Sequence, residues 1–168
     1  MIIILKATNK DIEAIDKITK QAFIIYQQKL NSGAKVAALS ETKDDIALDI
    51  KTNSIFVAKF DDDILGIIRY KMLSGNLAYI YRFAVDSSNK AIGVGKQLLE
   101  FVFAKLTNNN IDAICLHTNT EYTTLSRYYQ NHGFIINSVC EKKGYKRGLF
   151  VKELSKNKNY DLSPALKM

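Results

Sequence analysis

The most constraining feature of the sequence is a strand-like run that leads through a polar loop into a glycine pair and an amphipathic helix. The run covers residues 77–85, and the glycines are Gly93 and Gly95. Apolar side chains then recur at helical spacing: Val94, Leu98, Leu99, Val102 and Leu106. The first amides of a helix lack intrahelical partners, and the helix dipole makes that end positive. The pattern therefore predicts an anion site at the start of this helix, with Lys90 and Lys96 adding positive charge.

Periodicity along the rest of the chain predicts a mixed α/β protein. Strands are expected at residues 2–6, 55–60, 64–73, 77–85, 111–117, 134–140 and 149–154. Four helices are expected. The first runs from the Thr8/Asp11 capping signal to about residue 30, and the second covers 41–52 with Ser40 or Thr42 as its cap. The third begins after Gly93, and the fourth covers 120–131. Antiparallel hairpins come first and one β-α-β crossover lies in the middle. This order predicts a mixed sheet with a ligand site where the crossover helix begins.

The length of 168 residues predicts a single domain over residues 1–154, followed by a polar and flexible tail at 155–168. No apolar run approaches the ~18 residues that span a bilayer, so we expect no membrane segment. The short apolar start of the chain has no basic leader and is interpreted as a strand. Cys115 and Cys140 have no metal-type partner at short spacing, which favours free thiols in a reducing cytoplasm.

The net charge of +7 is concentrated near the C-terminus. Residues 142–168 contain eight Lys and Arg against two acidic side chains, which leaves +1 for the other 141 residues. These residues do not form the aromatic-interleaved basic stripe of single-strand binders, so we do not expect nucleic-acid binding.

Two well-known phosphate-binding motifs do not fit the glycine turn. With Gly95 and Lys96 at the end of a P-loop, Lys90 occupies the position of the first glycine and Gln97 that of the magnesium-binding hydroxyl. The dinucleotide fingerprint fails because Leu98 stands where its third glycine belongs.

The turn instead resembles the GNAT superfamily of acyl-CoA-dependent N-acyltransferases. The family pattern Arg/Gln/Lys-x-x-Gly-x-Gly/Ala begins five residues after a strand-ending apolar residue, here Val85, and residues 90–95 read Lys-Ala-Ile-Gly-Val-Gly. Lys90 and Ala91 replace the usual Arg and Gly. The family's Tyr-x-x-x-Gly-Phe is matched by Tyr129 with Gly133-Phe134. The resemblance covers nearly the whole chain and is most specific over residues 80–134.

The resemblance implies a GNAT-like fold: a mostly antiparallel twisted sheet, a V-shaped splay between the fourth and fifth strands, and about four flanking helices. It implies an N-acetyltransferase with acetyl-CoA as co-substrate and no metal, in which a primary amine attacks the thioester directly. A non-catalytic acyl-CoA-binding or partner-binding module of the same fold is the alternative. Because family members often dimerise, a homodimer is expected by resemblance alone.

The resemblance also assigns residue roles. Cofactor-binding positions are Phe83, Ala84 and Val85 on the central strand, and Lys90, Ala91, Ile92, Gly93, Val94, Gly95 and Lys96 at the turn. Tyr129 is the candidate general acid, since a phenol keeps its proton at neutral pH, and Tyr128 competes for the role. The family often carries Asn where this chain has Tyr122, so Asn119 is predicted as a substitute pantetheine contact.

The sequence does not identify the general base or the amine acceptor. Candidates for the base are His117, Glu121 and Asp86, although a lone His at a strand end is more often structural. Arg82 and Tyr81 are candidates to line the acceptor site, which should come from residues 26–54. Four acidic side chains in that segment would suit a cationic amine, but a solvated helix face is favoured: Glu41, Asp44, Asp45 and Asp49.

Overall fold

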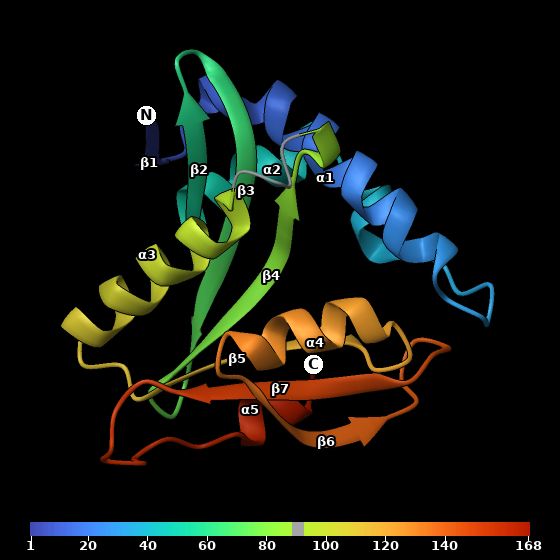
Figure 1. Cartoon of the computed structure of the whole chain (residues 1–168), viewed down its shortest axis with the longest axis vertical. Coiled ribbons are helices and arrows are strands. Elements are labelled where there is room, and N and C mark those ends of the chain that lie inside the picture. Colours follow the sequence, from blue (N-terminus) through green and yellow to red (C-terminus); the bar gives the residue numbers. More distant parts are fainter. Residues whose placement is uncertain (89–92) are drawn as a thin grey trace. The chain divides into compact units, whose positions relative to one another are not determined.

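The computed structural model describes residues 1–88 and 93–168 and contains a mixed seven-stranded sheet with helices (Figure 1). The strands are β1 Ile2–Lys6, β2 Ser54–Phe60, β3 Asp63–Leu73, β4 Leu77–Val85, β5 Ala113–Asn119, β6 Ile135–Cys140 and β7 Arg147–Glu153. The α-helices are α1 Ile12–Gln28, α2 Lys43–Thr52, α3 Val94–Asn108, α4 Thr123–Asn131 and α5 Ser163–Leu166, with 3₁₀ turns η1 Asn9–Asp11 and η2 Ala37–Ser40. The predicted fold class is confirmed.

The strands are hydrogen-bonded in the order β1-β2-β3-β4-β5-β7-β6. β4 and β5 pair in parallel, whereas β1–β2, β2–β3, β5–β7 and β6–β7 pair antiparallel. The parallel pair is the β-α-β crossover through α3, as the sequence order predicts. No helix in residues 1–88 or 93–168 combines the length and apolar character needed to cross a membrane.

The chain forms two compact units. Unit 1 comprises residues 1–27, 35–70 and 82–102, and unit 2 comprises residues 28–34, 71–81 and 103–168. Because β3 and β4 are each divided between the units, the backbone is continuous from one unit to the other within these strands.

The core of unit 1 follows the alternation of β2. Ile55 and Val57 join a buried cluster with Ile15 and Ile18 of α1 and with Ile46 of α2. The intervening Phe56 points to the opposite face, where its ring centroid lies 5.0 Å from that of Phe101 on α3. Helices therefore cover both faces of this part of the sheet (Figure 1).

Capping side chains set where α2 begins. The Thr42 hydroxyl accepts a hydrogen bond from the Asp45 amide at 3.2 Å, and Asp45 Oδ2 accepts one from the Thr42 amide at 2.8 Å. This reciprocal pair confirms Thr42 as the predicted cap. The Asp45 carboxylate is therefore engaged in the helix cap. Hydrogen bonds from the Thr42 amide and hydroxyl lower its pKa.

A glycine on β3 fixes how closely α3 approaches the sheet. A Cβ at Gly66 would lie 2.9 Å from Val94 Cγ1, 3.1 Å from Leu98 and 3.3 Å from the Ala84 carbonyl oxygen. Any larger residue would push the first turns of α3 away from the end of β4. The start of α3 is therefore held against the strand that precedes the glycine turn.

The core of unit 2 lies on one face of β4, β5 and β7 and includes part of the C-terminal segment. Ala165 of α5 is fully buried in a cluster with Leu77, Tyr79 and Leu149. The Asp161 amide also donates to the Gly75 carbonyl at 2.9 Å. The sequence predicts a flexible tail here, but residues 160–168 pack onto this unit. Polar composition conceals the few apolar residues, Leu162, Ala165 and Met168, that make the contacts.

Candidate functional site

The ladder between β4 and β5 is short. In the described residues it covers three pairs, Leu77↔Ala113, Ala78↔Ile114 and Tyr79↔Cys115. β5 continues to pair with β7 as far as Asn119↔Arg147. A short parallel ladder is what the predicted splay between the fourth and fifth strands requires. Phe83, Ala84 and Val85 lie on β4 beyond this ladder, and their cofactor-binding role stays a prediction.

Strand β4 is distorted just before these residues. Arg82 has φ +50°, a left-handed conformation that is rare for a non-glycine residue inside a strand. Such a residue breaks the strand's alternation and re-aims the neighbouring peptide groups. Backbone strain of this kind costs ~1–3 kcal/mol and is concentrated at functional sites.

Gly93 begins the described part of the glycine turn. It has φ +72°, and apart from its chain neighbours no atom of residues 1–88 or 93–168 lies within 4 Å of the position that a Cβ would occupy. Its carbonyl accepts the first hydrogen bond of α3 from the Gln97 amide at 3.1 Å. Gly93 therefore both turns the chain into the helix and leaves the first amides uncovered by a side chain.

Three predicted cofactor-binding residues, Lys90, Ala91 and Ile92, lie outside the described residues. Lys96 lies in the first turn of α3 with its side chain 64% exposed, and its ammonium is 3.7 Å from Glu100. An exposed pair of this kind is weak, so Lys96 keeps most of its freedom to meet an anion.

Helix α4 directs its two tyrosines to different surroundings. Tyr129 is buried, with its ring centroid 5.7 Å from Phe134 and 6.0 Å from Phe150. Tyr128 lies against His132, with ring centroids 4.4 Å apart. Adjacent helical residues point about 100° apart, so the two hydroxyl groups lie in different environments.

Burial raises the pKa of Tyr128 to about 12, so its phenol is protonated at any physiological pH. The imidazole of His132 holds the end of α4, because its Nδ1 lies 2.7 Å from the Tyr128 carbonyl oxygen and donates to it. Gly133, at φ +89°, then ends the helix as predicted.

Asn119 is almost completely buried, with 1% of its surface exposed. Its Oδ1 accepts from the Glu121 amide at 2.9 Å, and its Nδ2 lies 3.5 Å from the Lys29 carbonyl oxygen. The ammonium of Lys29 also lies 5.9 Å from the ring centroid of Tyr122, the residue at the family's Asn position. Asn119 therefore joins residues 28–34 to the end of β5. Its pantetheine role stays a prediction and would require these bonds to be exchanged.

The candidate bases are already engaged with neighbours. His117 Nδ1 lies 2.9 Å from the Tyr79 hydroxyl, and burial, followed by the charge of Arg147, lowers the His117 pKa to about 4. Asp86 Oδ1 accepts from the Ser88 amide and hydroxyl at 2.9 and 2.7 Å. Glu121 lies 3.6 Å from Lys146. The contacts of His117 match the structural role that the sequence favours.

The acidic residues of the predicted acceptor segment fall into two groups. Asp44 and Asp45 are exposed on α2, as the solvated-face interpretation expects. Glu41 and Asp49 are mostly buried, with side chains 12% and 13% exposed, and both bind Arg69. The expectation of a solvated face is wrong for these two.

Arg69 is the residue that the sequence analysis missed. It is fully buried on β3, where it follows Ile67 on the same face of the strand. A charged residue at an inward position of an apolar strand signals a buried ion pair, and this signal could have found it.

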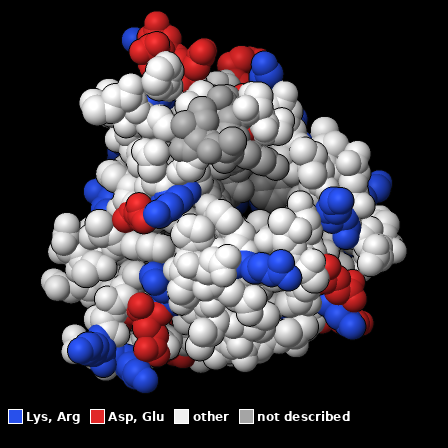
Figure 2. Space-filling view, viewed as in Figure 1, with Lys and Arg blue, Asp and Glu red and all other residues white. Residues whose placement is uncertain are grey.

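Basic and acidic side chains are interspersed on the described part of the face in Figure 2. Near the C-terminal end, Lys158 lies 4.0 Å from Glu153, and the ammonium of Lys152 lies 5.0 Å from the ring centroid of Phe103. Part of the basic excess is therefore engaged locally. In residues 1–88 and 93–168, no group of three or more His, Cys, Asp or Glu is placed to hold a metal ion.

Comparison with known proteins gives consistent results. Residues 20–134 match the model of the acetyltransferase (GNAT) family. The fold is similar to the PaiA N-acetyltransferase of Thermoplasma acidophilum in complex with coenzyme A, with TM-score 0.76 and 16% identity over 91% of this chain and 99% of that one. It is also similar to a GNAT-family acetyltransferase from Staphylococcus aureus, with TM-score 0.72 and 18% identity over 92% of this chain and all of the other. An IAA acetyltransferase from Bacillus cereus matches with TM-score 0.67 and 15% identity over 91% and 99%.

Proposed function

Since this chain belongs to the GNAT family of acetyltransferases, we propose that it transfers an acetyl group from acetyl-CoA to a primary amine by direct attack within a ternary complex. The family places it among the acyltransferases. We assign the catalytic domain to residues 1–154. The free thiols of Cys115 and Cys140 suit a reducing, cytoplasmic setting.

One observation carries the cofactor assignment. Gly93 adopts a positive φ immediately before the first amides of α3, and no described atom beyond its chain neighbours lies within 4 Å of its Cβ position. A helix start of this kind binds phosphate groups through backbone N–H donors and the helix dipole. The coenzyme A held by the similar Thermoplasma protein supports the pyrophosphate of acetyl-CoA as that anion.

The chemistry then needs few protein groups. The amine nitrogen attacks the thioester carbonyl carbon, and backbone groups of Phe83, Ala84 and Val85 stabilise the developing oxyanion. The C–S bond breaks as the new C–N bond is completed. The departing thiolate takes the phenolic proton of Tyr129, while the amine loses its proton to water or to a base.

The first experiment is calorimetry with acetyl-CoA, followed by free-thiol release with a panel of amines. We expect Tyr129→Phe to lower kcat by roughly 10²-fold or more while the affinity for acetyl-CoA is retained, because general acids contribute ~10²–10⁴-fold. Tyr128→Phe is the matched control, since it removes the same hydroxyl one position away on α4 and should leave thiol release close to wild type.

The outcomes separate the alternatives. No acetyl-CoA binding by a folded protein would reject the proposal. Binding without thiol release from any amine would favour a non-catalytic acyl-CoA-binding module. Unchanged release by Tyr129→Phe would remove Tyr129 as the acid while leaving the transferase assignment intact.

A further inference from the structure

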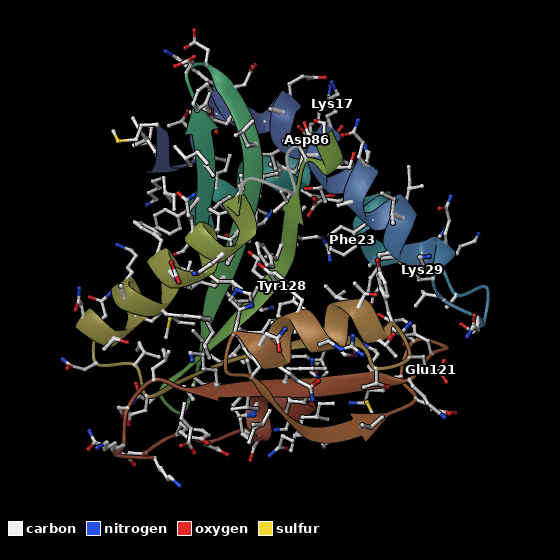
Figure 3. All side chains as sticks on the ribbon, viewed as in Figure 1. Lys17, Phe23, Lys29, Asp86, Glu121 and Tyr128 are labelled. Atoms are coloured by element: carbon white, nitrogen blue, oxygen red, sulfur yellow. The ribbon has the colours of Figure 1, made fainter. Side chains whose placement is uncertain are left out.

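The guanidinium of Arg82 is only loosely paired with described residues. Its side chain is 24% exposed, Nε lies 3.5 Å from Glu41 Oε1, and Nε has no hydrogen-bond partner among the described residues. The guanidinium carbon lies 5.9 Å from the ring centroid of Phe23, which points from α1 toward β4 (Figure 3). An aromatic ring on one side of an arginine orients the guanidinium without using its N–H donors.

Glu41 cannot neutralise Arg82 fully, because Arg69 already holds both of its oxygens. Arg69 Nη1 donates to Glu41 Oε1 at 2.9 Å, and Nη2 donates to Oε2 at 3.0 Å. Two parallel charge-assisted bonds of this kind form the stronger pairing. Arg82 thus shares a carboxylate that is already committed to another arginine.

The same contacts remove the acidic residues as a site for a cation. Asp49 Oδ2 accepts from Arg69 Nη1 at 3.1 Å, and its Oδ1 accepts from Asn53 at 2.7 Å. The two negative charges of Glu41 and Asp49 are therefore balanced by Arg69 and Arg82 together, with Arg69 taking the short hydrogen bonds. The charge in this cluster that retains donor capacity is the positive one of Arg82.

The place of Arg82 on β4 connects this capacity to the acceptor. Arg82 directly precedes Phe83, Ala84 and Val85, and its φ of +50° takes its side chain out of the regular strand alternation. A group bound to its guanidinium would therefore be held by the residue next to the segment to which the thioester is assigned.

We propose that the acceptor is an amino acid or a similar small aminocarboxylate, and that Arg82 binds its carboxylate. The guanidinium fork matches a carboxylate with two parallel hydrogen bonds, and it would place the neighbouring amine toward β4. Arg82 is then a specificity-determining residue that binds the non-reacting end of the substrate. This inference rests on the proposed acetyltransferase function.

The test compares common α-amino acids with their α-amides in the free-thiol assay, for wild type, Arg82→Gln, Arg82→Lys and Arg127→Gln. Removing one member of a desolvated charge pair costs enough that Arg82→Gln should lower kcat/KM for the preferred amino acid roughly 30-fold or more, mainly through KM. Arg82→Lys keeps the charge without the fork and should be intermediate. Arg127 is an exposed arginine on α4, so Arg127→Gln should behave as wild type.

A second readout does not depend on turnover. In protein labelled with ¹⁵N-arginine, the Arg82 Nε–H resonance, assigned by its loss in Arg82→Gln, should shift when the N-acetylated amino acids are added, and not with their amides. Absence of a shift with every carboxylate-bearing probe, or equal turnover of acids and amides, would overturn the proposal. Retained acetyl-CoA binding in the same samples would show that the proposed function stands while the acceptor class is wrong.

Discussion

Two buried arginines, one in each unit, have opposite surroundings. Arg69 in unit 1 has no exposed surface and binds Glu41, Asp49 and the Thr19 hydroxyl. Arg147 in unit 2 is 5% exposed, and its Nη1 donates at 3.3 Å to the main-chain oxygen of Met168. Both have an Nε without a hydrogen-bond partner in the described residues.

The difference shows how a buried charge acts when counterions are present and when they are not. Arg69 is compensated by two carboxylates, so it joins η2 and α2 to β3. No Asp or Glu side chain of the described residues pairs with Arg147 within 4.0 Å. Burial is the main cause of the pKa shifts of His117 and Tyr79, to about 4 and about 12, and the charge of Arg147 acts to lower both pKa values. A paired charge fixes structure, whereas a less compensated one changes the protonation of its neighbours.

The largest expected effect tests the paired arginine. Arg69→Met should lower the free energy of unfolding by ~3–5 kcal/mol, because it leaves the buried Asp49 without its cation and Glu41 with only the longer contact to Arg82. Urea denaturation monitored by circular dichroism measures the loss. Arg147→Met is the comparison and should cost much less, since it leaves no buried Asp or Glu side chain without its cation.

Adding Glu41→Gln and Asp49→Asn to Arg69→Met should recover part of this loss, because the unpaired charges are then gone. If Arg69→Met and Arg147→Met were equally destabilising, the distinction between the two arginines would be lost.

The second prediction concerns pH. His117 has a folded pKa of about 4 and an ordinary value near 6.5, so the unfolded chain binds more protons between these values. The stability that comes from keeping His117 neutral is present above pH 6.5 and is lost as the pH falls toward 4. We expect a loss of about 2 kcal/mol, after allowing for partial exposure of the ring.

The control is His117→Gln, which should show a shallower loss over the same pH range in denaturation experiments. Arg147→Met should raise the His117 pKa, measured by NMR titration, yet leave it below 6.5 because burial is the larger cause. A His117 titration near 6.5 in the wild type would contradict the burial argument.

The smallest effect concerns the support of the Arg69 contacts. Thr42→Ala removes the cap of α2, the helix that carries Asp49, and should cost ~1 kcal/mol. Thr42→Ser retains the hydroxyl and should restore most of the stability, as measured by thermal unfolding. A loss as large as that of Arg69→Met would mean that the cap, and not the ion pairs, holds α2 in place.

The order of strands and helices could be predicted because each depends on local periodicity and caps. The ends of some strands and helices differ from the prediction. The strand expected at 111–117 is β5 at Ala113–Asn119, and the helix expected at 120–131 begins at Thr123. Packing and hydrogen bonding decide such ends, because the chain's local preferences change little over two or three residues.

What the sequence determined by itself is the glycine turn, the family and the fold class. A glycine pair, a helix start and an offset from a strand are properties of adjacent residues, so they can be recognised from the sequence alone. The packing of residues 160–168 could not be recognised in this way, because a few apolar residues in a polar segment do not reveal which surface they cover.

Only the tertiary structure decided which charges near the predicted acceptor segment remain available. Arg69 lies 28 residues from Glu41 and 20 from Asp49 in the sequence, and folding brings them within 3.1 Å. Pairing at that separation depends on the sheet register and on the placement of α2. This pairing turns an acidic segment from an apparent cation site into a cluster in which Arg69 and Arg82 balance the two carboxylates, with the short hydrogen bonds going to Arg69 and only a 3.5 Å contact to Arg82.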